Sequence, residues 1–424
     1  MAIRLAVENL PPAASLFLVI LVGIVLLGII VRPYGTRPWQ WSLGGALVLW
    51  AGGAFRGAGV GAVAAALWEA RDVGLFLVGI ITIAAVARQA RLFDAAAERL
   101  LALSGGYRGR LLLLTFGFGV LCTAVLSNDT TVVALTPAVI TLALALKEDP
   151  APYTYACALV ASAASFLLPI ANPANLLLYG SALPGLMEWL RTFGPASLGA
   201  LAVTFIVLRL IFARSLRGRS ETQLDLAVLT PAERAVGIAV ALAIVLLLLA
   251  TLLHRPPGAA AFLGGAIVLG VGLIARCYTL EDARSINLSV LPFVAGLLAI
   301  LVAVERSHAL VTLHRRLLDA SAHGVAGSWF AASVVAIASA LANNLPIAAL
   351  VARIATPDLA AGMHRALVIA VDLGPNFAMS GSLATLLWAQ SLKEHGIKIR
   401  ARDFARVGIA CTLPAFVVAL LLAR

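Results

Sequence analysis

The sequence predicts an all-α polytopic membrane protein made of two inverted repeats. Of its 424 residues, 62% are hydrophobic and only 12% are charged, whereas soluble domains carry about a quarter charged residues. Apolar stretches such as 14–31, 236–253 and 404–423 are long enough to cross ~30 Å of hydrocarbon as helices. Their apolar side chains do not alternate with polar ones, which argues against a β-barrel.

Two pairs of polar breaks in the apolar stretches predict the repeats. A hairpin tip at 127–130 is followed by a break at 171–175, and a tip at 342–346 is followed by a break at 372–376. The second pair lies about half the chain length after the first. Interrupted segments at corresponding positions of two halves are typical of transporters, whose substrate site lies near the membrane midplane. We therefore predict a first repeat over residues 1–215 and a second over residues 216–424.

Each repeat is predicted to hold about five transmembrane helices, a re-entrant hairpin and a broken helix. Apolar runs bounded by charged or turn-forming residues predict the crossings, and polar breaks inside such runs predict the other two elements. In the first repeat the crossings lie near 14–31, 41–55, 73–87 and 194–212, with an amphipathic segment at 92–103, the hairpin at 110–147 and the broken helix at 153–181. In the second repeat the crossings lie near 235–253, 259–275, 287–304 and 404–423, with an amphipathic segment at 308–320, the hairpin at 326–353 and the broken helix at 364–391.

The charge distribution predicts the topology. Each half has five crossings when its broken helix is counted with the four apolar runs above, and this odd number gives the halves opposite orientations, as an inverted repeat requires. With both termini outside the cell, about two thirds of the 31 Lys and Arg residues fall in cytoplasmic loops, in agreement with the positive-inside rule. This bias explains the net charge of +11, so no nucleic-acid partner is expected. The first apolar run lacks a cleavage site and is predicted to be a retained helix of a multi-pass protein in the inner (plasma) membrane.

The hairpin tips are candidate ligand sites. Non-helical backbone at membrane depth must be buried in protein or line an aqueous cavity. Asn128 and Thr130, with their neighbours in the first tip, are good helix-capping residues, and the backbone N–H groups beyond them attract oxygen ligands. Asn343 and Asn344 precede a Leu-Pro pair and are interpreted in the same way. The alternative is that these side chains only cap their own helices.

Asp129 and Asp372 are the acids expected deepest in the membrane. Ionisable residues there commonly belong to proton or cation pathways, so we predict Asp129 as the first proton carrier and Asp372 as the second. The alternative is a salt-bridged or capping acid. None of the four breaks contains Lys or Arg, which favours a neutral polyhydroxyl compound or a small cation as substrate.

Nothing in the sequence predicts an enzyme. The four cysteines are far apart and lack metal-ligand spacing, and no nucleophile–base arrangement is present. Neither a metal nor a cofactor is expected.

At these motifs the chain resembles the arsenite efflux permeases, the membrane proteins of bacterial arsenical pumps, within the ion transporter superfamily. The resemblance is strongest at Asp372-Leu373-Gly374-Pro375, at the run 381–388 that follows, and at 396–399. Asn128-Asp129 with the Leu-Thr-Pro at 135–137, and Asn343-Asn344 with Leu345-Pro346, match the two hairpin signatures of the family. The chain departs from the family pattern at 130–131 and at 376–380.

The resemblance implies a scaffold and a mobile transport domain, which alternate access by an elevator-like shift. It also implies export of arsenite or antimonite, as the trihydroxide, in exchange for protons across the lipid bilayer. The substrate-binding groups would be amides and hydroxyls in the breaks, namely those of Asn128, Thr130, Asn172, Asn175, Asn343, Asn344, Asn376, Ser382 and Thr385. A cytoplasmic ATPase subunit is a further possible partner, which the basic loops at 88–110 and 393–406 could receive.

Other functions on the same fold stay open. A sodium/proton antiporter and a sodium-coupled carboxylate transporter are the nearest alternatives. Paired Ser-Asn-Thr tips would favour the carboxylate transporter, but the second tip reads Ala342-Asn343-Asn344. A channel, or a membrane subunit that serves an ATPase, is an alternative of another class.

Overall fold

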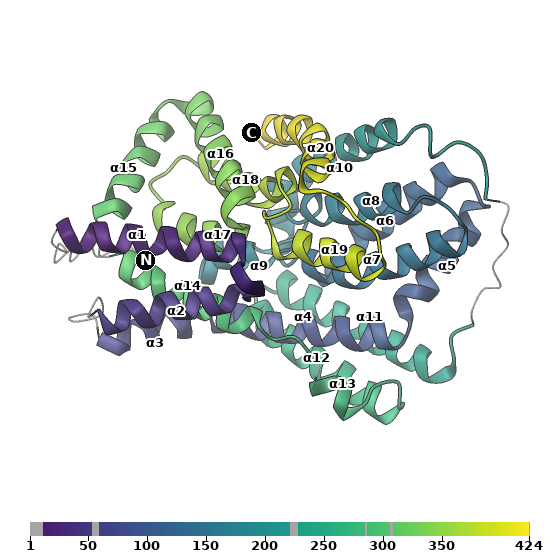
Figure 1. Cartoon of the computed structure of the whole chain (residues 1–424). Coiled ribbons are helices and arrows are strands. Elements are labelled where there is room, and N and C mark those ends of the chain that lie inside the picture. Colours follow the sequence, from purple (N-terminus) through teal and green to yellow (C-terminus); the bar gives the residue numbers. More distant parts are fainter. Residues whose placement is uncertain (1–11, 53–58, 221–227, 285, 306–307, 424) are drawn as a thin grey trace.

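The protein is all-α. The computed structural model describes residues 12–52, 59–220, 228–284, 286–305 and 308–423, and every regular element within these ranges is a helix (Figure 1). This confirms the predicted fold class. The predicted division at residues 215 and 216 falls between α10 and α11.

The elements follow the same order in the two halves, with an extra short helix in each. The first half contains α1 (Pro12–Val31), η1 (Pro33–Gly35), α2 (Pro38–Ala51), α3 (Gly59–Glu69), α4 (Arg71–Gln89), α5 (Leu92–Ser104), α6 (Arg108–Leu126), α7 (Asn128–Ala145), α8 (Ala151–Ala163), α9 (Pro173–Tyr179), η2 (Gly180–Ala182) and α10 (Leu186–Ile211). The second half contains α11 (Pro231–Leu252), α12 (Pro257–Ile274), α13 (Leu280–Arg284), α14 (Val290–Val304), α15 (His308–Ala322), α16 (Gly324–Ala342), α17 (Asn344–Ile354), α18 (Ala361–Leu373), η3 (Gly374–Phe377), α19 (Leu383–Glu394) and α20 (Ala401–Leu422).

Eight helices in the described ranges are long and apolar enough to cross a membrane: α4, α6, α7, α10, α11, α12, α16 and α20. The expected crossings α2 and α14 have only 14 and 15 residues, and the predicted end of the first of them, at 53–55, lies outside the described residues. Both arms of the first hairpin, α6 and α7, qualify as crossings by length, whereas α17 has 11 residues. A re-entrant course for the hairpins therefore stays a prediction.

The short helices α3 and α13 were not expected from the sequence. α3 begins inside a glycine-rich run at 52–61, and such a run suggests a loop because glycine weakens helices. The helix α13 has five residues and carries too few apolar positions to show a helical period.

Helices of one half pack against helices of the other half, in pairs that correspond between the halves (Figure 1). α4 packs along α12, and the corresponding pair α14 and α2 also packs together. In the same way α7 packs on α19 and α17 on α9, and α10 packs on α20. Each pair maps onto its counterpart when the halves are swapped, which is the pattern expected of a two-fold relation. The inverted orientation of the halves stays a prediction.

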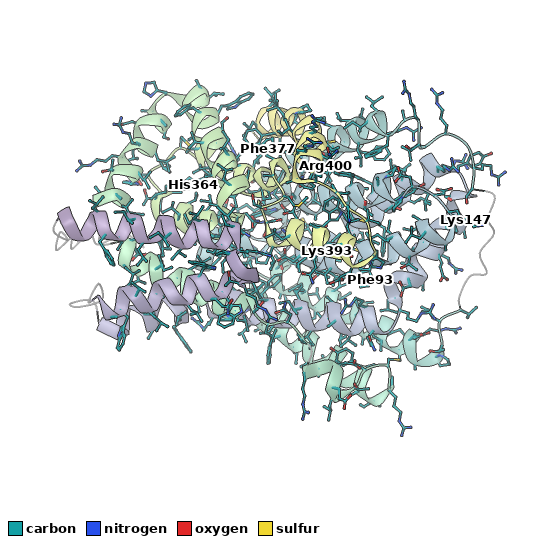
Figure 2. All side chains as sticks on the ribbon, in the orientation of Figure 1. Phe93, Lys147, His364, Phe377, Lys393 and Arg400 are labelled. Atoms are coloured by element: carbon teal, nitrogen blue, oxygen red, sulfur yellow. The ribbon has the colours of Figure 1, made fainter. Side chains whose placement is uncertain are left out.

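Two buried tryptophans fix the helices around the breaks. The indole N–H of Trp388 in α19 donates to the carbonyl of Thr154 in α8 (2.8 Å), and that of Trp189 in α10 donates to Phe166 (3.0 Å), just beyond α8. Phe377, at the end of η3, lies near α18 and α20, which both pack against η3 (Figure 2). α8 is thus held in its first turn by the second half, through Trp388, and just beyond its last turn by the first half, through Trp189.

Glycines allow α4 and α12 to approach closely. A Cβ atom at Gly79 would lie 2.1 Å from the carbonyl oxygen of Ala261, and one at Gly265 would lie 2.8 Å from the carbonyl oxygen of Gly79. Small residues at helix interfaces let backbones pack against each other where lipid provides no hydrophobic drive for association. The main contact between the halves along these two helices therefore requires glycine.

We predict that Gly79→Ala lowers the stability of the purified protein by about 1–3 kcal/mol, because the methyl group would force α4 and α12 apart. The matched control is Gly74→Ala on the same helix, where a Cβ would meet no atom within 4 Å; it should be neutral or slightly stabilising. Chemical or thermal unfolding in detergent measures both. Equal stability of the two variants would contradict the close approach.

Candidate functional site

Each hairpin turns at a single residue with left-handed backbone. Ser127, between α6 and α7, has φ 84°, and Asn343, between α16 and α17, has φ 73°. Such values are uncommon for residues other than glycine. The predicted tips at 127–130 and 342–346 are thus shorter than expected, because Asn128 and Asn344 already begin the second helix of each hairpin.

The tips are hydrogen-bonded to the breaks in the broken helices. The backbone N–H of Asn128 donates to the carbonyl of Ala171 (3.0 Å), and the N–H of Asn344 donates to the carbonyl of Gly381 (3.0 Å). Both acceptors lie immediately before a helix N-cap, Asn172 of α9 and Ser382 of α19. Each half therefore joins its own hairpin tip to its own broken helix.

The side chains at the tips also cap helices. The Asn343 Oδ1 atom accepts from the N–H of Leu345 (3.1 Å), and the Asn128 Oδ1 atom accepts from the N–H of Asp129 (2.8 Å). The hydroxyl of Ser127 donates to Thr130 Oγ1 (3.3 Å). Asn128, Thr130, Asn343 and Asn344 are all buried. At Asn343 the side chain therefore caps its own helix, which is the role that the sequence left open as the alternative to ligand binding.

The first of two polar clusters surrounds Asp372. This residue lies in the last turn of α18 and is 1% exposed. Its Oδ1 atom accepts from the Ser165 hydroxyl (2.6 Å) and from the amide Nδ2 of Asn172. Both donors belong to the break between α8 and α9. An acid of the second half is thus held by the broken helix of the first half.

Asn172 and Asn175 connect this cluster to α9. Asn172 caps α9 by accepting from the N–H of Ala174 (3.0 Å) while its Nδ2 binds Asp372. Asn175 donates through Nδ2 to the carbonyl of Ser165 (2.9 Å). Asn376 in η3 donates through Nδ2 to the carbonyl of Leu159 in α8 (3.0 Å). Asn172 and Asn175 thus lie just beyond the end of α8, whereas Asn376 bonds α8 itself.

Three buried oxygen acceptors around α8 and the break after it are unpartnered. The Oδ2 of Asp372 and the Oδ1 atoms of Asn175 and Asn376 are buried and have no hydrogen-bond partner among the described residues. The amide orientations are fixed, because Nδ2 faces a carbonyl in each asparagine. A buried acceptor without a partner costs about 1–3 kcal/mol. The cluster is therefore suited to a ligand that presents several hydrogen-bond donors.

The second cluster surrounds the N-terminus of α19. Ser382 and Thr385 form a capping box: Ser382 Oγ accepts from the N–H of Thr385 and Thr385 Oγ1 accepts from the N–H of Ser382, both at 3.1 Å. The half-buried carboxyl group of Asp129 faces the backbone N–H of Ala384 in the first turn of α19. An acid of the first half thus lies at the broken helix of the second half.

The two acids belong to different clusters. Within the described residues, no hydrogen bond joins Asp129 to Asp372. A surface hollow of about 450 Å³ lies beside the second cluster, lined by Ala378, Met379, Ser380, Leu386, Ala401, Arg402 and Ala405. The structure links Asp372 directly to Asn172 and, through Ser165, to Asn175. Asn376 is bonded to Leu159 in α8 instead. Asp129 lies at the N-terminus of α19, the helix that Ser382 and Thr385 cap.

Ser165 was not expected from the sequence. It contacts Asp372 directly and accepts from Asn175, yet it lies in a Ser-Phe-Leu-Leu-Pro run without a recognisable motif. The one available signal was a small polar residue a few positions before Pro169 in an otherwise apolar segment. Its partner is 207 positions away, beyond the reach of any local pattern.

The chain is similar to known membrane transporters over most of its length. A model of the family described as "Citrate transporter", CitMHS, matches residues 5–374. The arsenical pump membrane protein of Escherichia coli is 27% identical over 401 residues, which cover 90% of this chain and 92% of that protein. The arsenical pump membrane protein of Yersinia enterocolitica is 28% identical over 74% of this chain and 77% of its own length. A 46 kDa membrane protein of Mycobacterium leprae is 24% identical over 83% of this chain and 85% of its own length.

A solved structure shares the fold. The crystal structure of the Alcanivorax borkumensis YdaH transporter matches 97% of this chain and 98% of its own chain with a TM-score of 0.58. The sequence identity is 13%, so this likeness concerns the fold alone. Together with the apolar helices, the matches make the chain a multi-pass membrane protein of a transporter family.

We predict that Asn343→Ala is more damaging than Asn343→Gly. Both variants lose the cap on α17, which is worth about 1 kcal/mol, but only alanine adds the cost of positive φ, about 1–2 kcal/mol. Thermal unfolding in detergent gives the difference, and substrate titration of the folded glycine variant tests the ligand role. Unchanged apparent affinity in Asn343→Gly would leave this side chain with a capping role alone.

Proposed function

The chain belongs to the citrate transporter family, CitMHS, and within this family we propose that it exports arsenite or antimonite in exchange for protons. The relatives named arsenical pump membrane protein support the substrate, since one of them aligns with 90% of this chain. Transport would proceed by alternating access, with the hairpins and broken helices moving as a unit in an elevator-like shift.

The observation that carries the proposal is the chemistry of the Asp372 cluster. Arsenite at neutral pH is largely an uncharged trihydroxide with three O–H donors. The residues around α8 and the break after it offer three unpartnered acceptors, one each from Asp372, Asn175 and Asn376, and none of the four breaks contains Lys or Arg. Buried groups that match a ligand's hydrogen-bonding pattern reject ligands that leave them unpaired. A neutral polyhydroxyl substrate therefore fits this site.

Proton coupling follows if substrate and proton compete for Asp372. An ionised carboxylate only accepts hydrogen bonds, whereas a protonated one has an O–H donor in place of one acceptor. On the cytoplasmic side, the ionised Asp372 would accept an O–H group of arsenite. On the outer side, protonation would remove that acceptor and release the substrate. The sequence favours Asp129 as the first proton carrier and Asp372 as the second. We reverse this order because Asp372 is buried with an unpartnered oxygen.

Citrate is the second candidate substrate, because the printed description of the family names it. Citrate is a multiply charged anion, and the four breaks hold no cationic side chain to neutralise it. Citrate binding would therefore need cations that enter with it, such as sodium ions. This dependence distinguishes the two candidates.

We expect everted membrane vesicles that contain the protein to accumulate arsenite when a proton gradient, acid inside, is imposed. The control is vesicles without the protein. Citrate flux is measured in parallel, with and without a sodium gradient. Sodium-dependent citrate flux with arsenite at the control level would refute the arsenite assignment and leave the family assignment intact.

We predict that Asp372→Asn and Asp129→Asn reduce gradient-driven arsenite accumulation to the level of vesicles without the protein. The amide cannot bind and release a proton, so exchange is blocked although the shape of the side chain is kept. Asp319→Asn, an exposed acid on α15, is the matched control and should transport normally. Wild-type accumulation in Asp372→Asn would remove this residue from the coupling mechanism.

A further inference from the structure

The Ser165 hydroxyl stands between two acceptors. Its Oγ atom is 2.6 Å from Asp372 Oδ1 and 2.8 Å from the backbone carbonyl of Ser162. Ser165 is fully buried and lies just after α8, in the break of the first half. Both distances are those of O–H···O hydrogen bonds.

A serine hydroxyl has one proton, so Ser165 can donate to only one of these acceptors at a time. When Asp372 is ionised it needs donors, and the Ser165 proton points to Oδ1. When Asp372 is protonated it can itself donate to Ser165 Oγ, and the serine proton then turns to the Ser162 carbonyl. The Ser162 carbonyl also accepts from the backbone N–H of Ser165 (3.2 Å), so it keeps a partner in either state.

This switch of the Ser165 hydroxyl between its two acceptors needs no displacement of heavy atoms. It reverses the bond between Asp372 and Ser165 and, in the protonated state, adds a bond from the Ser165 hydroxyl to the carbonyl of Ser162 near the end of α8. The carbonyl of Ser165 accepts from Asn175, and Asn172 binds the same carboxyl oxygen while it caps α9. The protonation state of an acid in the second half is thus linked to the amides of α9 in the first half.

We propose that Ser165 is a positioning residue that responds to the proton on Asp372 by reversing its hydrogen bond, and so couples the acid to the first-half break. This inference rests on the proposed role of Asp372 in proton exchange. It assigns a function to a residue that lies outside the four polar breaks identified in the sequence.

Several elements that carry titratable groups pack against the helix of Asp372. The elements that pack against α18 are α8, α9, α16, α17, α20 and η3. The titratable residues of these elements are Tyr153, Tyr155 and Cys157 of α8, Tyr179 of α9, Arg353 of α17, and Arg402, Asp403, Arg406 and Cys411 of α20. Among the described residues, Tyr179 is the one for which an electrostatic interaction with Asp372 is found, and Tyr179 also interacts with Arg365 on α18 itself. A Tyr179→Phe variant therefore accompanies the test.

The test measures thermal unfolding of the purified protein as a function of pH, which needs no substrate. Ser165→Ala removes a donor to the ionised acid, so the pH at which Asp372 ionises should rise by about one unit or more. The destabilisation should accordingly be larger at high pH than at low pH. In an Asp372→Asn background the effect of Ser165→Ala should no longer depend on pH. Tyr179→Phe should leave this dependence on Ser165 in place.

Three further variants make the result decisive. Ser165→Thr keeps the hydroxyl and should keep the wild-type pH profile. Ser165→Cys supplies only a weak donor and should shift the profile in the same direction as alanine, which covers the case in which the alanine variant does not fold. Ser197→Ala, which removes a buried hydroxyl that bonds the Ala163 carbonyl (3.4 Å), should not shift it. A pH-independent effect of Ser165→Ala, or an equal effect in the Asp372→Asn background, would overturn the proposal.

Transport gives a second, separate measurement. In everted vesicles the pH of half-maximal arsenite accumulation should rise by about one unit in Ser165→Ala and stay unchanged in Ser197→Ala. If wild-type vesicles do not accumulate arsenite, the proposed substrate fails, while the unfolding experiment still decides the role of Ser165.

Discussion

Backbone groups in a helix break that is surrounded by apolar side chains must find partners, and this constraint organises the centre of the protein. Each hairpin tip gives one N–H to the broken helix of its own half, from Asn128 to Ala171 and from Asn344 to Gly381. An unsatisfied backbone group in hydrocarbon costs several kcal/mol. The tips must therefore lie against the breaks, and the capping side chains of Asn172 and Ser382 are held beside them.

The side chains at the breaks add links between the halves. Asp372 of the second half is bound by the first-half break, and Asp129 of the first half faces the N-terminus of α19 in the second. Buried polar groups in such networks are stabilising when they are satisfied and costly when they are not. The unpartnered oxygen atoms around Asp372 are kept in place by the surrounding packing, in which Trp388 and Trp189 bind the main chain around α8. The packing around α8 thus offsets the cost of leaving these oxygen atoms unpartnered.

Membership of the CitMHS family and likeness to the YdaH structure identify the fold, whereas the substrate depends on the side chains at the breaks. One fold can host many functions, so substrate has to be argued from the chemistry of the site. Here that chemistry is an acid, amides and hydroxyls without a cationic side chain in the breaks. The same backbone with Lys or Arg at those positions would suit an anion.

The sequence by itself determined the all-α class, the order of the elements and the positions of the breaks, because composition and helical period are local properties. Broken helices were expected at 153–181 and 364–391, and the structure has α8–α9 and α18–α19 there. The sequence did not predict the short helices α3 and α13, the one-residue hairpin tips, or the contact of Ser165 with Asp372. Only the tertiary structure decided that Asp372 binds Ser165 and Asn172, which are 207 and 200 positions away, and that Asp129 lies at α19 instead. Contacts of that range arise from how helices pack, and no local pattern of residues encodes them.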